Sequence, residues 1–191
     1  RYSRNLANGL GARYNLGDHA PVEGYSNFLW MLIAAFFEYI GFDVTIWMPV
    51  LSFVMGVWLL GLIIHTLHVR IGMSLGVTGL AGLVYATFVP TAVWTTSGLA
   101  TTPQTALMFA AFVWLAYGEN RRDYLFAGLF ALMLALVRTE GIAWGVVIAG
   151  VAVVSRLLRE RSFREGVFVY FGVLLLGFSL YFAWRYSYYE T

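Results

Sequence analysis

Six stretches without Asp, Glu, Lys or Arg dominate the chain. They cover residues 44–67, 73–90, 103–118, 124–137, 141–154 and 166–184. A helix needs about 20 apolar residues to cross the roughly 30 Å hydrocarbon core of a bilayer, and several stretches approach that length. Helices and closed barrels are the structures that satisfy backbone hydrogen bonds within lipid. The sequence therefore predicts an all-α fold, a polytopic transmembrane bundle of about six spans.

The overall composition excludes an ordinary soluble domain. The 191 residues are 60% hydrophobic and 12% charged, whereas a soluble domain is about 25% charged. There is no cysteine, which excludes a disulfide framework and a Cys-ligated metal. The net charge of +2 says little about partners, and we expect no nucleic acid among them.

Residues 1–43 differ from the remainder of the chain. Residues 1–11 place apolar side chains four apart, which is typical of a short amphipathic helix at a membrane surface. Residues 12–26 have the Gly, Pro, Asp and Asn content of a polar loop. The apolar run 27–40 would be about 21 Å long, too short to span a bilayer, and is expected to be a re-entrant or tilted juxtamembrane helix. We therefore divide the chain into 1–43 and a bundle over 44–191.

The distribution of arginine predicts the topology. If the run 27–40 returns to its starting side, the sequence places Arg70 and the turns 119–123 and 155–165 on one face. Arginine-rich turns are typical of the cytoplasmic side. The other face then collects residues 1–43, a charge-free turn over 90–102, the RTEG turn at 138–141 and most of the tryptophans. A fully crossing 27–40 run would invert this orientation.

Two polar interruptions are candidates for function. Arg138 and Glu140 lie between two short apolar helices, where ionised groups are costly unless they pair or face a polar cavity. Both interpretations remain open. The segment EGYSNFLW begins a membrane helix whose N–H groups could meet an anion, although a cap from Ser26 or Asn27 explains it equally well.

Other signals point to ordinary membrane structure. His65 and His68 are spaced to share a metal, but no third ligand is nearby, so we interpret them as interfacial histidines. The closing YFAWRYSYYET could bind sugars or lipid headgroups, but aromatic residues are common where a helix leaves the membrane. The chain has no Walker A loop, HExxH, GxSxG or dinucleotide fingerprint.

Taken together, the polar segments resemble the GT-C class of membrane glycosyltransferases, in particular relatives of the mycobacterial terminal arabinofuranosyltransferase. RYSRNLANGLGARYN is similar to that group's RYARNLAEGHGLVFN, and EGYSNFLW to its EGYTNFLW. TSGLATTP and RTEG resemble SGLETP and RPEG, and the closing RYSYYET resembles a YYG segment. The order of the segments is the same from end to end.

The resemblance implies an integral protein of the plasma membrane with these segments outside the cytoplasm. It implies transfer of a sugar from a polyprenyl-phosphate donor to a glycan, lipid or protein acceptor. In that family an Asp just ahead of the RYxRN segment is the expected catalytic base, and this chain begins after that position. Here Ala100 stands where the family has an acidic residue, and Thr139 where it has proline.

From the residues and the resemblance together we predict a substrate-binding cavity with cationic groups on phosphate. Arg4 or Arg138 would bind phosphate, and Glu23 or Glu140 would bind sugar or a divalent cation. The predicted residues are Arg4, Glu23, Tyr25, Asn27, Arg138 and Glu140. Residues 1–27, 95–103 and 138–141 must then converge on one side of the membrane.

Two alternatives remain open. A non-catalytic membrane subunit would retain the GT-C scaffold and pack within a larger complex, which Ala100 allows. A transporter or channel could use the same intramembrane Arg and Glu, but the sequence shows no inverted repeat.

Overall fold

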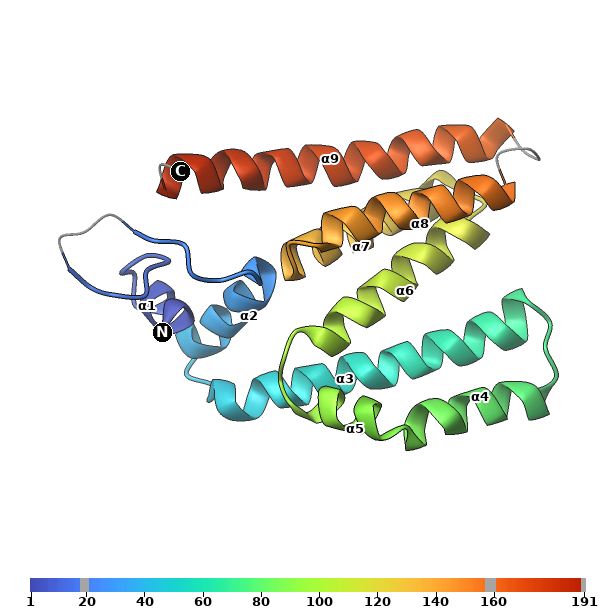
Figure 1. Ribbon diagram of the computed structural model, residues 1–191, viewed down its shortest axis with the longest axis horizontal. Coiled ribbons are helices and arrows are strands. Elements are labelled where there is room, and N and C mark those ends of the chain that lie inside the picture. Colours follow the sequence, from blue (N-terminus) through green and yellow to red (C-terminus); the bar gives the residue numbers. More distant parts are fainter. Residues whose placement is uncertain (18–20, 157–160, 190–191) are drawn as a thin grey trace.

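The computed structural model describes residues 1–17, 21–156 and 161–189, and these form helices joined by turns and loops (Figure 1). The helices are α1 (Tyr2–Ala7), α2 (Phe28–Tyr39), α3 (Val44–His65), the π-helical turn η1 (Thr66–Arg70), α4 (Leu75–Thr87), α5 (Val89–Thr96), α6 (Thr101–Tyr117), α7 (Arg121–Val137), α8 (Gly141–Arg156) and α9 (Arg161–Tyr189). The expectation of an all-α fold is confirmed for these residues.

Two helices in the described part of the chain are long and apolar enough to cross a membrane. They are Val44–Arg70, with 27 residues, and Glu165–Tyr189, with 25. The pair α4 and α5 provides a third if it counts as one span, although its axes differ by 60°. Helices α6 and α7 have 17 residues each, about 26 Å, so six spans remain a prediction.

The expected turn over residues 90–102 is wrong in its first half, because Val89–Thr96 forms helix α5. Pro90 lies at the start of this helix, where its fixed φ favours helix and its missing N–H costs nothing. Phe88 is extended between the two helices. The apolar run therefore bends into two helices.

The core lies where α7 packs between α6, α8 and α9. Ala127 and Ala131 of α7 are fully buried, and their small side chains allow close helix packing. A Cβ on Gly128 would lie 3.0 Å from the carbonyl oxygen of Tyr170 on α9. The buried Tyr170 hydroxyl donates to the carbonyl of Gly145 on α8 at 2.8 Å. Small residues and one satisfied hydroxyl thus join three helices.

The polar segments gather at opposite ends of this bundle (Figure 1). One end holds α1, the loop after it, the α5–α6 connection, the α7–α8 turn and the last residues of α9; we call it the motif end. The other end holds η1 and the α6–α7 turn, with Arg70, Arg121 and Arg122; we call it the arginine end. The described residues of segment 1–27 and the segments 95–103 and 138–141 therefore share one end, as the hypothesis of a common site requires.

Candidate functional site

An ion pair at the motif end joins the N-terminal loop to the last turns of α9. Arg185 places Nε 2.6 Å and Nη2 2.5 Å from Oε2 of Glu23. The Glu23 side chain is 16% exposed and that of Arg185 is 38% exposed. Because charge-assisted bonds of this kind are stronger than neutral ones, this pair fixes the loop on the end of α9.

Tyrosine hydroxyls reinforce the same junction. Tyr189 donates a hydrogen bond to the carbonyl of Ala12 at 2.9 Å and shares another with the Tyr25 hydroxyl at 3.0 Å. The Tyr188 hydroxyl accepts from the Ala12 amide at 3.0 Å. Burial is the main cause that raises the pKa of Tyr25 well above its usual range, and the hydrogen bond with Tyr189 is the second. The Tyr25 hydroxyl therefore remains protonated across the physiological range.

Aromatic rings surround this hydrogen-bonded junction. The Tyr25 ring lies 5.1 Å from that of Tyr2 in an edge-to-face arrangement and 6.2 Å from that of Phe28. Phe28 also lies 5.0 Å from Trp184 of α9. Such pairs stabilise a packed aromatic cluster beyond their buried area. The cluster gives this end a rigid wall without long flexible side chains.

An open groove of about 340 Å³ lies beside the aromatic cluster. It lies among α1, α2, the start of α3 and the α5–α6 connection, and its lining residues are Arg1, Tyr2, Ser3, Tyr25, Asn27, Trp30, Met31, Ala34, Val44, Thr45, Met48 and Gly98. Trp30 donates from Nε1 to the Gly98 carbonyl at 2.9 Å. The groove thus brings EGYSNFLW and TSGLATTP together.

Gly98 is required by the backbone at this junction. Its φ is +72°, and a Cβ there would lie 2.8 Å from Cδ of Pro49. Both facts favour glycine, so the α5–α6 connection can press against α3 and present its carbonyl to Trp30. The backbone conformation of Gly98 and its close contact with Pro49 therefore fix the position of the SGL segment against α3.

Asn27 offers an uncommitted polar group to the groove. It occupies the N-cap position of α2, but its side chain makes no capping hydrogen bond. Asn27 is therefore the N-cap residue, as one of the two interpretations of EGYSNFLW allowed, although its side chain contributes no hydrogen bond to the cap. The amide can donate and accept, which suits it to a ligand with several hydroxyls.

The groove combines a positive charge with aromatic rings and hydrogen-bonding groups. Arg1 supplies a positive charge, Tyr2 and Tyr25 supply aromatic rings, and Asn27 and Thr45 supply hydrogen-bonding groups. Its volume falls within the 300–1,000 Å³ typical of small-molecule sites. None of the described residues that line it is a carboxylate.

The structure does not bring all six predicted site residues together. Tyr25 and Asn27 line the groove, and Glu23 adjoins it through the ion pair with Arg185. Arg4 lies outside the groove lining; its side chain is 71% exposed and its Nε lies 3.6 Å from a Glu38 carboxylate oxygen. The Arg4 interaction is therefore a surface ion pair.

Arg138 and Glu140 pair with each other at the turn between α7 and α8. Their side chains are 39% and 43% exposed, and Nη2 lies 2.8 Å from Oε1. Hydrogen bonding by its own backbone amide and by Arg138 lowers the pKa of Glu140. Of the two open interpretations, this geometry corresponds to an ion pair. Neither residue lines the groove.

Sequence reasoning missed Arg185 and the roles of Trp30 and Gly98. The C-terminal RYSYYET segment was a visible signal, but nothing in sequence spacing pairs Arg185 with a glutamate 162 positions earlier. Trp30 was visible only as one of several interfacial tryptophans. Contacts between distant segments supply these assignments.

The described residues offer no cluster of three or more His, Asp or Glu that could hold a metal ion. His68 Nδ1 lies 3.0 Å from the Met73 carbonyl oxygen, so its ring takes part in the turn after η1. A divalent cation at the motif end stays a hypothesis.

Comparisons of the chain with protein-family models, with curated proteins and with solved structures found no significant match. The site is therefore interpreted from its own geometry and from the residue patterns described above.

Proposed function

We propose that this chain is the N-terminal membrane part of a GT-C-type glycosyltransferase. It would transfer a sugar from a polyprenyl-phosphate donor to a glycan, lipid or protein acceptor. The motif end would face the outside of the plasma membrane, with the arginine end in the cytoplasm. Membrane lipids, and possible further membrane subunits, would surround the bundle of about six spans.

One observation carries the proposal. Segments far apart in the chain, which together resemble GT-C motifs, meet at one end around a groove lined by Tyr25, Asn27 and Gly98. Aromatic rings beside hydrogen-bonding groups can hold a sugar through stacking and its hydroxyls, and a guanidinium can hold a phosphate.

The position of Arg1 supports the expected source of the catalytic base. Arg1 lines the groove, and consecutive Cα atoms are about 3.8 Å apart. An Asp immediately ahead of Arg1 would therefore lie at the groove, where the resemblance expects the base. A base must reach the acceptor hydroxyl within hydrogen-bond distance.

The geometry changes the roles within the proposed site. In the proposed site Arg1, in place of Arg4 or Arg138, would contact the donor phosphate, since it alone of the three lines the groove. Tyr25 and Asn27 would contact the sugar. Glu23 would act as a positioning residue, because Arg185 occupies one of its carboxylate oxygens.

Glycosyl transfer by the full-length protein tests the proposal. The purified protein, in lipid nanodiscs, is incubated with polyprenyl-phosphate sugars and an acceptor glycan. Asn27→Ala is expected to lower kcat/KM about 3- to 10-fold, the effect of one hydrogen bond to substrate. Arg122→Gln at the other end is the matched control. Absence of transfer with every donor, or equal loss in both variants, contradicts the proposal.

The main alternative is a non-catalytic subunit with the same scaffold. Two observations favour it: Ala100 stands at the position where the family carries an acidic residue, and the described groove lining has no carboxylate. In that case the purified chain would co-isolate with a membrane partner, and its groove variants would leave sugar transfer by the complex unchanged.

A further inference from the structure

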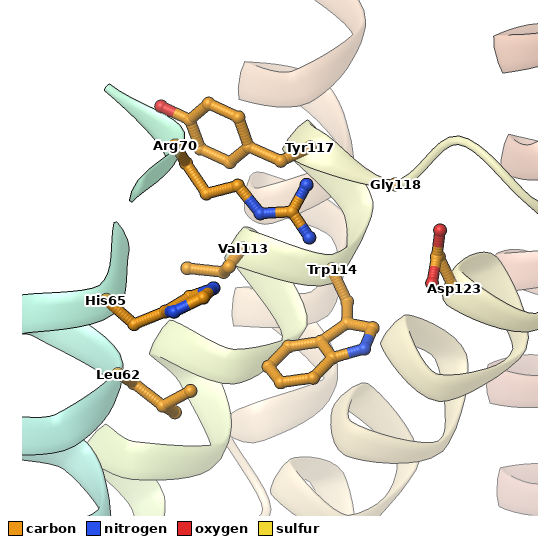
Figure 2. Close-up of a pocket in the computed structure, with 8 residues that line it drawn as sticks. All are labelled: Leu62, His65, Arg70, Val113, Trp114, Tyr117, Gly118 and Asp123. Carbon is orange, nitrogen blue, oxygen red and sulfur yellow. The ribbon is translucent and has the colours of Figure 1, made fainter. Parts of the chain in front are cut away.

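A second polar cavity lies at the arginine end, remote from the groove. Figure 2 shows it between the end of α3 with η1 on one side and α6 with the start of α7 on the other. Its volume is about 50 Å³, and its lining residues are Leu62, His65, Arg70, Val113, Trp114, Tyr117, Gly118 and Asp123. This space holds one or two water-sized atoms.

Arg70 reaches into this cavity without a partner among the described residues. It ends the π-helical turn η1, a rare local structure that is frequent at functional sites. Figure 2 shows its guanidinium extending between Tyr117 and Trp114, with the His65 ring below it. No ion pair or hydrogen bond satisfies the guanidinium within the described chain.

The Asp123 carboxylate, which lines the same cavity, accepts hydrogen bonds from the backbone at the start of α7. Oδ2 of Asp123 accepts from the backbone amides of Glu119 and Asn120 at 2.9 and 3.1 Å, and the bond from Asn120 belongs to the capping box of α7. Figure 2 shows the Asp123 carboxylate on α7, apart from the Arg70 guanidinium. The positive charge of Arg70 is therefore available to an external anion.

A larger groove of about 590 Å³ adjoins the cavity through Arg70 and Tyr117, which line both. Apolar side chains from η1, α6 and α8 line its remainder: Val69, Phe112, Ala116 and Val151, with Glu119 at one edge. A cationic pocket next to an apolar groove fits a molecule with a phosphate and an apolar tail. Arg70 also ends a candidate membrane span, and a residue at the end of a membrane-spanning helix would meet the lipid headgroups.

We propose that Arg70, with His65, binds a phosphate group at this cavity, and that the phosphate is that of an anionic lipid whose glycerol and chains lie along the adjoining groove. The phosphate oxygens would enter the small cavity and accept hydrogen bonds from the guanidinium fork, as Arg–phosphate pairs do. This site is independent of the proposed glycosyl transfer.

Binding of defined lipids to the full chain tests the site. The protein in detergent is titrated with phosphatidylglycerol, with phosphatidylcholine, or with inorganic phosphate, and bound lipid is counted by native mass spectrometry. The wild type is expected to prefer phosphatidylglycerol, and Arg70→Gln to weaken that binding about tenfold. Arg70→Lys, which retains charge without the fork, is expected to fall between the two.

Arg122→Gln provides the matched control, because Arg122 is exposed at the same end but lines neither cavity. If inorganic phosphate binds in an Arg70-dependent way and no lipid is preferred, the phosphate site is supported but the proposal that a lipid supplies the phosphate is refuted. Equal losses in Arg70→Gln and Arg122→Gln would show diffuse attraction and overturn the proposal. Absence of any anion binding by a folded wild type would also overturn it.

Discussion

Replacing Gly56 by alanine tests how α5 is held on α3 beside the groove. A Cβ at this position would lie 2.1 Å from Cγ2 of Thr95 on α5. The Thr95 hydroxyl donates to the Thr91 carbonyl oxygen and lies 3.2 Å from the Ala92 carbonyl oxygen. Because a β-branched side chain has few rotamers, Thr95 cannot easily turn its methyl group away. The new methyl group must therefore push α5 away from α3.

Gly61 lies on the same helix and supplies the matched control, because a Cβ at that position would have no neighbouring atom within 4 Å. Both substitutions gain about the same helix propensity, roughly 0.8–1 kcal/mol, so the difference between them isolates the steric cost. Overpacking costs about 1–3 kcal/mol. Gly56→Ala should therefore be about 1–3 kcal/mol less stable than Gly61→Ala in denaturant unfolding of the micelle-bound protein.

A second substitution sharpens this test. Thr95→Ser removes the clashing methyl group but retains the hydroxyl, so Gly56→Ala combined with Thr95→Ser should recover most of the lost free energy of unfolding. Equal stability of the two glycine variants, or no recovery in the double variant, would refute the packing of α5 against α3.

Three further predictions concern the polar groups. In a double-mutant cycle, Glu23→Gln and Arg185→Gln should couple by about 1–2 kcal/mol of unfolding free energy; zero coupling would contradict their ion pair. Burial raises the pKa of Tyr25 above its ordinary 10.0. Above pH 10 the unfolded chain therefore loses the Tyr25 proton while the folded chain retains it, so the contribution of Tyr25 to the free energy of unfolding is complete below pH 10 and declines above it. The stability advantage of wild type over Tyr25→Phe should therefore shrink between pH 10 and 12; a constant difference contradicts this. Glu140 has a pKa below its ordinary 4.5, so the stability advantage of wild type over Glu140→Gln should be a few tenths of a kcal/mol at neutral pH, given its exposure, and should decline as the pH falls below 4.5 and Glu140 becomes protonated; an undiminished advantage at pH 2 contradicts it.

The helices were largely predictable because charge marks their ends. The apolar runs 124–137 and 141–154 correspond closely to α7 and α8. The bend between α4 and α5 was not predicted, although Pro90 was a visible signal. The π turn after α3 carries no such signal, since its residues are compatible with a continuing α-helix.

The candidate site was predictable only in part. Tyr25 and Asn27 line the groove, as a site at EGYSN requires. Arg4 and Arg138 were chosen for their charge, but Glu38 and Glu140 lie close enough to pair with them. Sequence reasoning gives the type of group at each position, whereas the pairing of groups depends on helix packing.

The topology can be measured directly, because the 191 residues contain no cysteine and each introduced cysteine is therefore unique among them. Intact cells expressing Ser26→Cys, Thr139→Cys or Arg122→Cys are treated with a membrane-impermeant maleimide, and the protein is scored for labelling. All three positions are exposed. We expect labelling of Ser26→Cys and Thr139→Cys in intact cells, and of Arg122→Cys only after permeabilisation. Labelling of Ser26→Cys and Thr139→Cys from opposite sides would contradict the shared extracytoplasmic site.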